Sequence, residues 1–137
     1  MGYGVGDGSF QAAGGEAGIR QLVTRFYELM CARDIARDIR AMHPADLSVS
    51  SDKLSTFLCG WLGGPRLYQA KYGSISIPGV HAHLAVDAAA RDAWLTIMGE
   101  AVAEQDWAED FKHYLLAQLA VPAERVRAVC EEKRSSS

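Results

Sequence analysis

The chain has 137 residues, of which 49% are hydrophobic and 23% are charged, the composition of a globular domain with room for one core. Its formal net charge is −3 and its lysines and arginines form no cluster, which argues against a nucleic-acid partner. No apolar run is long enough to cross a membrane and no secretion signal is recognisable, so we expect a cytoplasmic protein without membrane contact. Cys31, Cys59 and Cys130 are far apart and lack zinc-site spacing, as expected in a reducing compartment.

The composition along the chain predicts a single domain with a short extension at each end. Residues 1–8 are rich in glycine, and the tail over 132–137 ends in three serines, so both are expected to be flexible. The domain between them covers residues 9–131.

Amphipathic helices are the predicted elements, because apolar residues recur at helical spacing and no segment alternates as a strand does. A short helix over 10–13, capped by Ser9, precedes a long helix over 16–30. A shorter helix over 33–42 follows. It ends at His43, because a residue that precedes proline avoids the helical conformation.

The middle of the chain is predicted to contain one helix and one irregular connection. Ser50 or Ser51 caps this helix, and the motif Gly63-Gly64-Pro65 ends it. Residues 66–80 have little periodicity and several glycine or proline breaks. A loop of about fifteen residues inside a compact domain is uncommon and usually functional, so a site is expected beside it.

Two further helices complete the predicted domain. Asp87 caps the first, and Asp106 with Glu109 has the spacing of a capping box at the start of the second. Pro122 begins either a further turn or a kinked continuation. The predicted fold class is therefore all-α, with four main helices and one long interrupted connection.

Two histidines, His81 and His83, lie just before the helix that Asp87 caps and are candidates for a metal site. Neutral imidazole is the commonest nitrogen ligand of transition metals. A structural or surface histidine is nevertheless the more common case in an irregular segment. The residues alone leave both possibilities open.

Several motifs follow one another along the chain. The Gly-Gly pairs at 14–15 and 63–64 come after the first short helix and after the middle helix, and the second pair belongs to Trp61-Leu62-Gly63-Gly64-Pro65. The other members are Phe26-Tyr27, Phe57-Leu58, Tyr68, His81 and Arg91-Asp92-Ala93-Trp94-Leu95. In this order the sequence resembles the group II truncated haemoglobins over roughly residues 9–129.

The resemblance implies a truncated globin fold, a two-over-two helical sandwich around one haem b. His81 matches the family's proximal iron ligand, which binds iron through one ring nitrogen while the other needs an acceptor such as a backbone carbonyl. His83 matches a position where the family usually has proline, so it is expected at the surface or on the propionate side. It remains the rival for iron.

On the distal side of the haem, the resemblance implies a group of ligand-binding residues. Trp94 matches the tryptophan characteristic of group II, whose indole N–H is only a donor. Tyr27 matches the distal tyrosine, a second donor. His43 matches a position of Phe, Tyr or His, from which an imidazole can hydrogen-bond Tyr27, and Ser50 falls at or next to the distal gate.

The resemblance also implies which residues surround the haem. Apolar side chains contact the porphyrin, and ammonium or hydroxyl groups hold the propionates. The apolar residues are Leu54, Phe57, Leu58, Val86 and Met98, with Trp94 on the distal side, and the polar residues are Lys53, Tyr68 and Lys71.

The sequence around His81 departs from the family pattern. Relatives carry arginines just before this histidine and a proline-rich run after it. Here residues 76–80 are uncharged and residues 82–86 contain no proline. Weaker anchoring of the propionates and a looser proximal loop are expected.

The function implied is that of a haem protein that binds O2, or another diatomic ligand such as NO or CO, at a five-coordinate iron with donors from Trp94 and Tyr27. The alternative is a haem enzyme that detoxifies NO or peroxide. With only 137 residues the chain has no room for a flavin or nicotinamide domain, so this enzyme needs an external reductase. No residue is assigned as catalytic. A helical interaction module without haem is the third hypothesis, and the sequence is compatible with a monomer or a homodimer.

Overall fold

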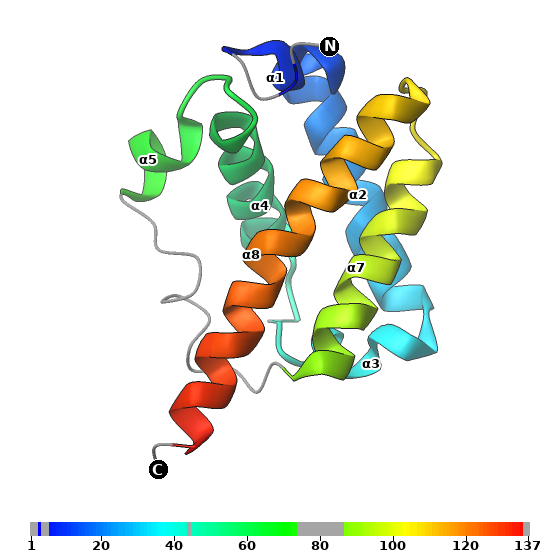
Figure 1. Ribbon diagram of the computed structural model, residues 1–137, viewed down its shortest axis with the longest axis vertical. Helices are drawn as coiled ribbons and strands as arrows, with labels where there is room; N and C mark the ends of the chain where they lie inside the picture. Colours follow the sequence, from blue (N-terminus) through cyan, green and yellow to red (C-terminus); the bar gives the residue numbers. More distant parts are fainter. Residues whose placement is uncertain (1–2, 4–5, 44, 74–86, 136–137) are drawn as a thin grey trace.

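The computed structural model describes residue 3 and residues 6–43, 45–73 and 87–135, with side chains up to residue 128 (Figure 1). Within these residues the secondary structure is helical and contains no strand, which confirms the all-α class. None of the helices described is long and apolar enough to cross a membrane.

The helices form two packed pairs. In chain order they are α1 (Gly8–Ala12), α2 (Gly15–Ala32), the 3-10 helix η1 (Asp34–Ala36), α3 (Arg37–Ala41), α4 (Ser48–Trp61), α5 (Leu67–Tyr72), α7 (Ala88–Ala103) and α8 (Glu109–Ser135). Helix α2 packs against both α4 and α7, and α7 packs against α8. Figure 1 shows the α7–α8 pair lying over the α2–α4 pair, with the short α5 at the edge beside α4. This arrangement is a two-over-two helical sandwich.

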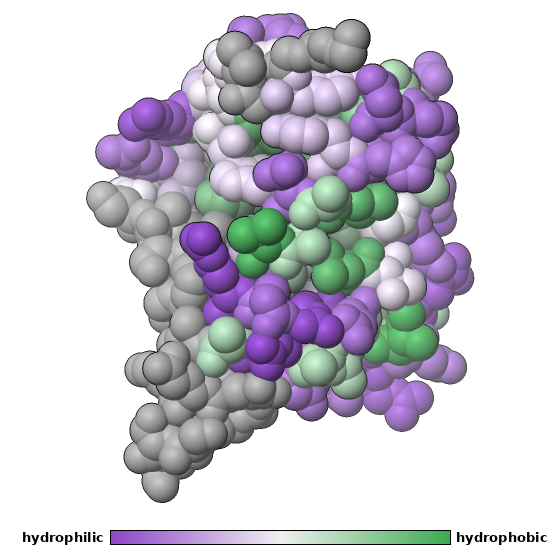
Figure 2. Space-filling view, viewed as in Figure 1, coloured by the Kyte–Doolittle hydropathy of each residue, from purple (hydrophilic) through white to green (hydrophobic). Residues whose placement is uncertain are grey.

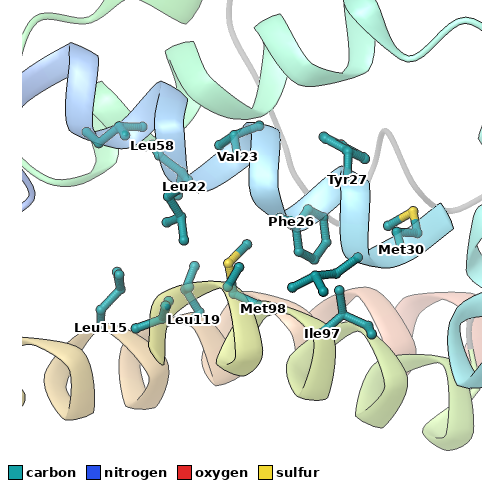
Figure 3. Packing of buried hydrophobic residues seen from close by; sticks show 14 of the residues in the cluster. Leu22, Val23, Phe26, Tyr27, Met30, Leu58, Ile97, Met98, Leu115 and Leu119 are labelled. Carbon is teal, nitrogen blue, oxygen red and sulfur yellow. The ribbon is translucent and has the colours of Figure 1, made fainter. Parts of the chain in front are cut away.

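Helix α2 is the centre of the core because its apolar residues form the predicted stripe. Ile19, Leu22, Val23, Phe26 and Met30 are all buried. Figure 3 shows Leu22 and Phe26 pointing toward α7, where Ile97 and Met98 point back, while Leu58 reaches α2 from α4. Burial of about 25 cal/mol per Å² of apolar surface makes this three-helix contact the main stabilising feature of the fold.

The end of α4 is shaped by the close approach of the N-terminal region. Gly63 has a φ of +94°, and a Cβ atom at this position would lie 2.0 Å from the carbonyl oxygen of Gly6. The backbone N–H of Phe10 donates to the carbonyl of Leu62 at 3.0 Å. A Cβ atom at Gly64 would come within 2.5 Å of the Phe10 ring. The predicted stop at the Gly-Gly-Pro motif is confirmed, and the two glycines make room for α1.

Two predictions about the middle of the chain are wrong. Helix α4 begins at Ser48 rather than after Ser50 or Ser51, and the backbone N–H of Ser48 donates to the Asp46 carboxylate at 2.9 Å. The segment predicted as an irregular loop over 66–80 contains α5. A six-residue helix is too short to show an apolar period, so the sequence pattern missed it. Residues 74–80 of that segment lie outside the described residues.

The last two helices confirm one capping prediction and correct another. The Asp87 carboxylate accepts a hydrogen bond from the backbone N–H of Ala90 at 2.8 Å, as an N-cap residue does. Helix α8 begins only at Glu109, so Asp106 does not cap it as the spacing predicted. The helix continues across Pro122, which is the predicted continuation rather than a separate turn.

The N-terminal segment contacts the domain through Tyr3. Its hydroxyl donates to the Asp110 carboxylate at 3.0 Å, and its ring centroid lies 5.2 Å from those of Phe111 and Tyr114. This residue therefore joins the start of the chain to the first turns of α8. The flexibility of residues 1–8 stays a prediction.

Candidate functional site

An aromatic group links α2 and α7 at the predicted distal position. The Phe26 ring is fully buried, and the Tyr27 ring meets it edge-on at 5.0 Å with an interplanar angle of 69°. The Trp94 ring meets Phe26 at 5.2 Å and 61°. Edge-to-face contacts at these distances favour both orientations. Phe26 therefore holds the two predicted hydrogen-bond donors on neighbouring helices.

The Tyr27 hydroxyl is buried with a poor acceptor. Tyr27 is only 8% exposed, and its hydroxyl donates to the carbonyl oxygen of Ser50 at 3.5 Å, the long limit for such a bond. Burial raises the pKa of Tyr27 to about 12. At neutral pH the phenol keeps its proton and remains able to donate to a stronger acceptor.

His43 lies against Tyr27 from the connection after α3. The two ring centroids are 5.7 Å apart at an interplanar angle of 76°. The His43 Nδ1 atom lies 2.7 Å from the carbonyl oxygen of Ile39. A carbonyl only accepts, so Nδ1 carries the hydrogen in this bond and the ring orientation is fixed. The two residues are therefore in ring contact, and the predicted hydrogen bond from His43 to Tyr27 stays a prediction.

Ser50 meets the site through its backbone. Its carbonyl oxygen accepts the hydrogen bond from the Tyr27 hydroxyl. Ser50 lies in the first turn of α4 and not at the cap of that helix. The predicted distal residues Tyr27, His43, Ser50 and Trp94 therefore come from α2, the α3–α4 connection, α4 and α7. Although these residues are far apart in sequence, contacts through Phe26 and Tyr27 connect them in the structure.

The residues predicted to contact the porphyrin divide into two kinds. Leu54 and Phe57 on α4 are half-buried, whereas Leu58 and Met98 are fully buried in the core between the helices. The Phe57 ring stacks on Trp61 at 6.1 Å with an interplanar angle of 25°. Trp61 is also half-buried, and it was not among the residues predicted to contact the porphyrin. Helix α4 therefore presents partly exposed apolar side chains, which suit contact with a flat apolar group.

The polar residues predicted to bind propionates gather where α4 meets α5. The Lys71 ammonium donates to the Asp52 carboxylate at 2.7 Å, and the Tyr72 hydroxyl donates to the same oxygen at 2.6 Å. Lys53 lies over the Tyr72 ring at 5.4 Å from its centroid, and the Tyr68 ring packs on Tyr72 at 5.0 Å.

Asp52 and Tyr72 were missed by the sequence analysis. The only sequence signal for them is that each stands directly beside a predicted propionate ligand, Lys53 or Lys71. The Lys71 ammonium, the Tyr72 hydroxyl and the Arg20 guanidinium hold the pKa of Asp52 at about 2, so this carboxylate is ionised at neutral pH.

Three predicted residues lie outside the described part of the chain, namely His81, His83 and Val86. Among the side chains that the structure describes, no three His, Cys, Asp or Glu groups come together as a metal site. The proximal assignment of His81 therefore remains a prediction.

Comparison with known proteins identifies the fold. The model of the bacterial-like globin family matches residues 8–127. A group 2 truncated hemoglobin of Bacillus subtilis, YjbI, is 28% identical over 123 residues, 90% of this chain and 91% of that protein.

Solved structures agree with this family match. A group II 2-on-2 hemoglobin of Agrobacterium tumefaciens superimposes with a TM-score of 0.83 at 35% identity, covering 87% of this chain and 92% of that one. A truncated oxygen-avid haemoglobin of Bacillus subtilis has a TM-score of 0.78 at 27% identity, covering 86% and 97%.

The globin family implies a haem cofactor and small gaseous ligands such as O2. The residues described here fit that group, because Leu54 and Phe57 offer incompletely covered apolar surface. Tyr27 adds a buried hydroxyl whose bond to the Ser50 carbonyl is long. The chain therefore belongs to the bacterial-like globin family, as a truncated haemoglobin of group II with the two-over-two fold.

Proposed function

We propose that this chain binds O2, and other diatomic ligands such as NO and CO, at the five-coordinate iron of a haem b whose proximal ligand is His81. The observation that carries the proposal is that Tyr27 and Trp94, from two different helices, both pack edge-on against the buried Phe26 ring. Haem supplies, when bound, the open coordination position at which a diatomic molecule is held. The chain supplies the hydrogen-bond donors around it.

Tyr27 and Trp94 are suited to donate to a bound ligand. An indole N–H cannot accept, and the Tyr27 phenol stays protonated because its pKa is about 12. A donor to a charged acceptor contributes about 1.5–3 kcal/mol, which slows ligand release by one to two decades. Slow release favours ligand retention or chemistry over bulk transport. The name of the oxygen-avid relative from Bacillus subtilis agrees with this expectation.

The other predicted residues have supporting roles. His43 orients Tyr27 through their edge-on ring contact, and Ser50 lines the distal entrance beside the Tyr27 hydroxyl. The remaining residues surround the haem. Leu54, Phe57, Leu58, Val86 and Met98 contact the porphyrin, and Lys53, Tyr68 and Lys71 bind its propionates.

The absorption spectrum of the purified protein tests the haem assignment. Wild type is expected to show a strong Soret band and a five-coordinate ferrous spectrum. His81→Ala should abolish that spectrum, because it removes the axial nitrogen, and His83→Ala is the matched control that should keep it. A normal five-coordinate ferrous spectrum in His81→Ala would overturn the ligand assignment.

A haem enzyme that detoxifies NO or peroxide is the second candidate. The two donors both contact Phe26, and such donors also suit a ligand whose O–O bond is being polarised. A histidine ligand gives less electronic push than a thiolate, and the electrons must come from an external reductase. Steady turnover of NO or peroxide with a reductase present would favour the enzyme, and stoichiometric reaction alone would favour the binding protein.

A further inference from the structure

A single carboxylate, that of Asp52, ties three helices together at the α4–α5 junction. One of its oxygens, Oδ2, accepts from the Lys71 ammonium at 2.7 Å and from the Tyr72 hydroxyl at 2.6 Å, both on α5. The other, Oδ1, accepts from the Arg20 guanidinium on α2 at 3.1 Å. Asp52 is mostly shielded from solvent, with a side chain that is 20% exposed. Both oxygens are therefore occupied by donors from other helices.

Two lysine ammonium groups converge on one ring beside this carboxylate. Lys53 Nζ lies 5.4 Å and Lys71 Nζ 5.6 Å from the centroid of Tyr72. Lys53 comes from α4 and Lys71 from α5. The negative face of an aromatic ring attracts both cations. Without the ring and the carboxylate, like charges on flexible side chains would separate.

The charges at this junction do not cancel. Arg20, Lys53 and Lys71 provide three cations, whereas Asp52 and Glu16, which pairs with Arg20 at 2.8 Å, provide two anions. Lys53 makes no ion pair within the residues that the structure describes. An additional carboxylate placed beside the two lysines would complete the balance. A lysine ammonium has three donors, so Lys71 can bind such a group without releasing Asp52.

We propose that Asp52 and Tyr72 are positioning residues for the haem propionates, which hold Lys53 and Lys71 together before the cofactor binds. This inference rests on the proposed function. Ordering a free lysine side chain on binding costs entropy, and a lysine that is already held loses less.

The rate of haem loss from the holoprotein to an excess of haem-free myoglobin measures the anchoring. Asp52→Asn is expected to raise this rate about threefold to tenfold, the effect of one charge-assisted hydrogen-bond network. Tyr72→Phe keeps the ring under both lysines and removes only the hydroxyl bond to Asp52, so it should raise the rate about twofold to threefold. Glu104→Gln is the matched control. It removes an exposed carboxylate that pairs with Arg25 between α2 and α7 at 2.8 Å, and it should leave the rate unchanged.

A double-mutant cycle separates positioning from general stabilisation. If Asp52 acts through Lys71, Asp52→Asn should add no further loss in a Lys71→Met background. A purely structural role would give additive effects. The propionate-bending band in the resonance Raman spectrum should also shift in Asp52→Asn and stay in place in Glu104→Gln.

The positioning role would be overturned if Asp52→Asn and Tyr72→Phe lost haem at the wild-type rate and the propionate band did not shift. Additive effects of Asp52→Asn and Lys71→Met would overturn it as well. Failure of the proposed function gives a different result, because wild type itself would then take up no haem.

Discussion

Tyr27 shows how burial prepares a single side chain for the proposed role. Its ring contacts the rings of Phe26 and His43, and its hydroxyl makes a long bond of 3.5 Å to the Ser50 carbonyl. A buried hydroxyl with a long bond gives up little of its hydrogen-bond energy when a better acceptor arrives. The resemblance predicted Tyr27 as a distal donor, and the structure shows that its side chain is buried.

The raised pKa of Tyr27 predicts a loss of stability at alkaline pH. The unfolded phenol ionises near pH 10 and the folded one near pH 12, so the folded state binds the proton more tightly. This contribution to the free energy of unfolding is present below pH 10 and is lost as pH rises through about 12. It amounts to about 3 kcal/mol, from about 1.4 kcal/mol for each of the two pKa units.

Urea unfolding of wild type and Tyr27→Phe at pH 9 and pH 11 checks this prediction. The other tyrosines and lysines titrate in both proteins, so the comparison isolates Tyr27. Wild type should lose more stability than the variant between the two pH values. Equal losses would show that the Tyr27 hydroxyl is not protected from ionisation.

At the scale of the elements, the contact between α1 and α2 depends on a glycine inside a helix. A Cβ atom at Gly18 would lie 1.9 Å from the carbonyl oxygen of Ala13, and the backbone has no flexible end that can move aside. The Gly14-Gly15 pair is recognisable in the sequence, because adjacent glycines commonly interrupt a helix. A lone glycine in a helical pattern carries no such signal.

Gly18→Ala is expected to destabilise the protein by about 1–3 kcal/mol, the usual cost of overpacking. Gly99→Ala is the matched control, because it also lies inside a long helix but its Cβ atom would meet only Leu116 Cδ1 at 4.0 Å. That change should be neutral or stabilising by up to about 1 kcal/mol. Chemical denaturation of the two variants measures both effects, and equal stabilities would contradict the close approach.

Ion pairs also join elements in ways that the sequence does not show. Arg91, in the Arg-Asp-Ala-Trp motif, binds Glu124 across the α7–α8 contact. Arg127 and Arg91 hold the pKa of Glu124 at about 2. A helical pattern identifies which residues share a face of one helix, and it contains no information on partners that are 33 positions apart. The same reason explains why Asp52 was missed.

At the scale of the whole molecule, most of the fold could be predicted, because the long helices bury regular apolar stripes. The α2 stripe, the Asp87 cap and the stop at Gly63-Gly64-Pro65 all follow from local patterns. The order of motifs then pointed to the correct family. Helix α5 is too short to show an apolar period, and α4 begins earlier than its serines indicated, next to Asp46, so these boundaries were wrong.

Some apolar side chains are exposed on the surface of the molecule. Figure 2 shows apolar side chains gathered in the middle of the face over α8, with hydrophilic residues around them. Val121, in α8, is 50% exposed. Single exposed apolar residues such as Val121 are ordinary on the surface of a globular domain.

The rate of O2 dissociation from the ferrous protein tests the central claim most directly. Trp94→Phe is expected to raise this rate at least tenfold, because phenylalanine fills the space but donates no hydrogen bond. Trp107→Phe makes the same chemical change beside Phe111, at the start of α8, and should leave the rate unchanged. If Trp94→Phe releases O2 at the wild-type rate, the distal donor role proposed for Trp94 is contradicted.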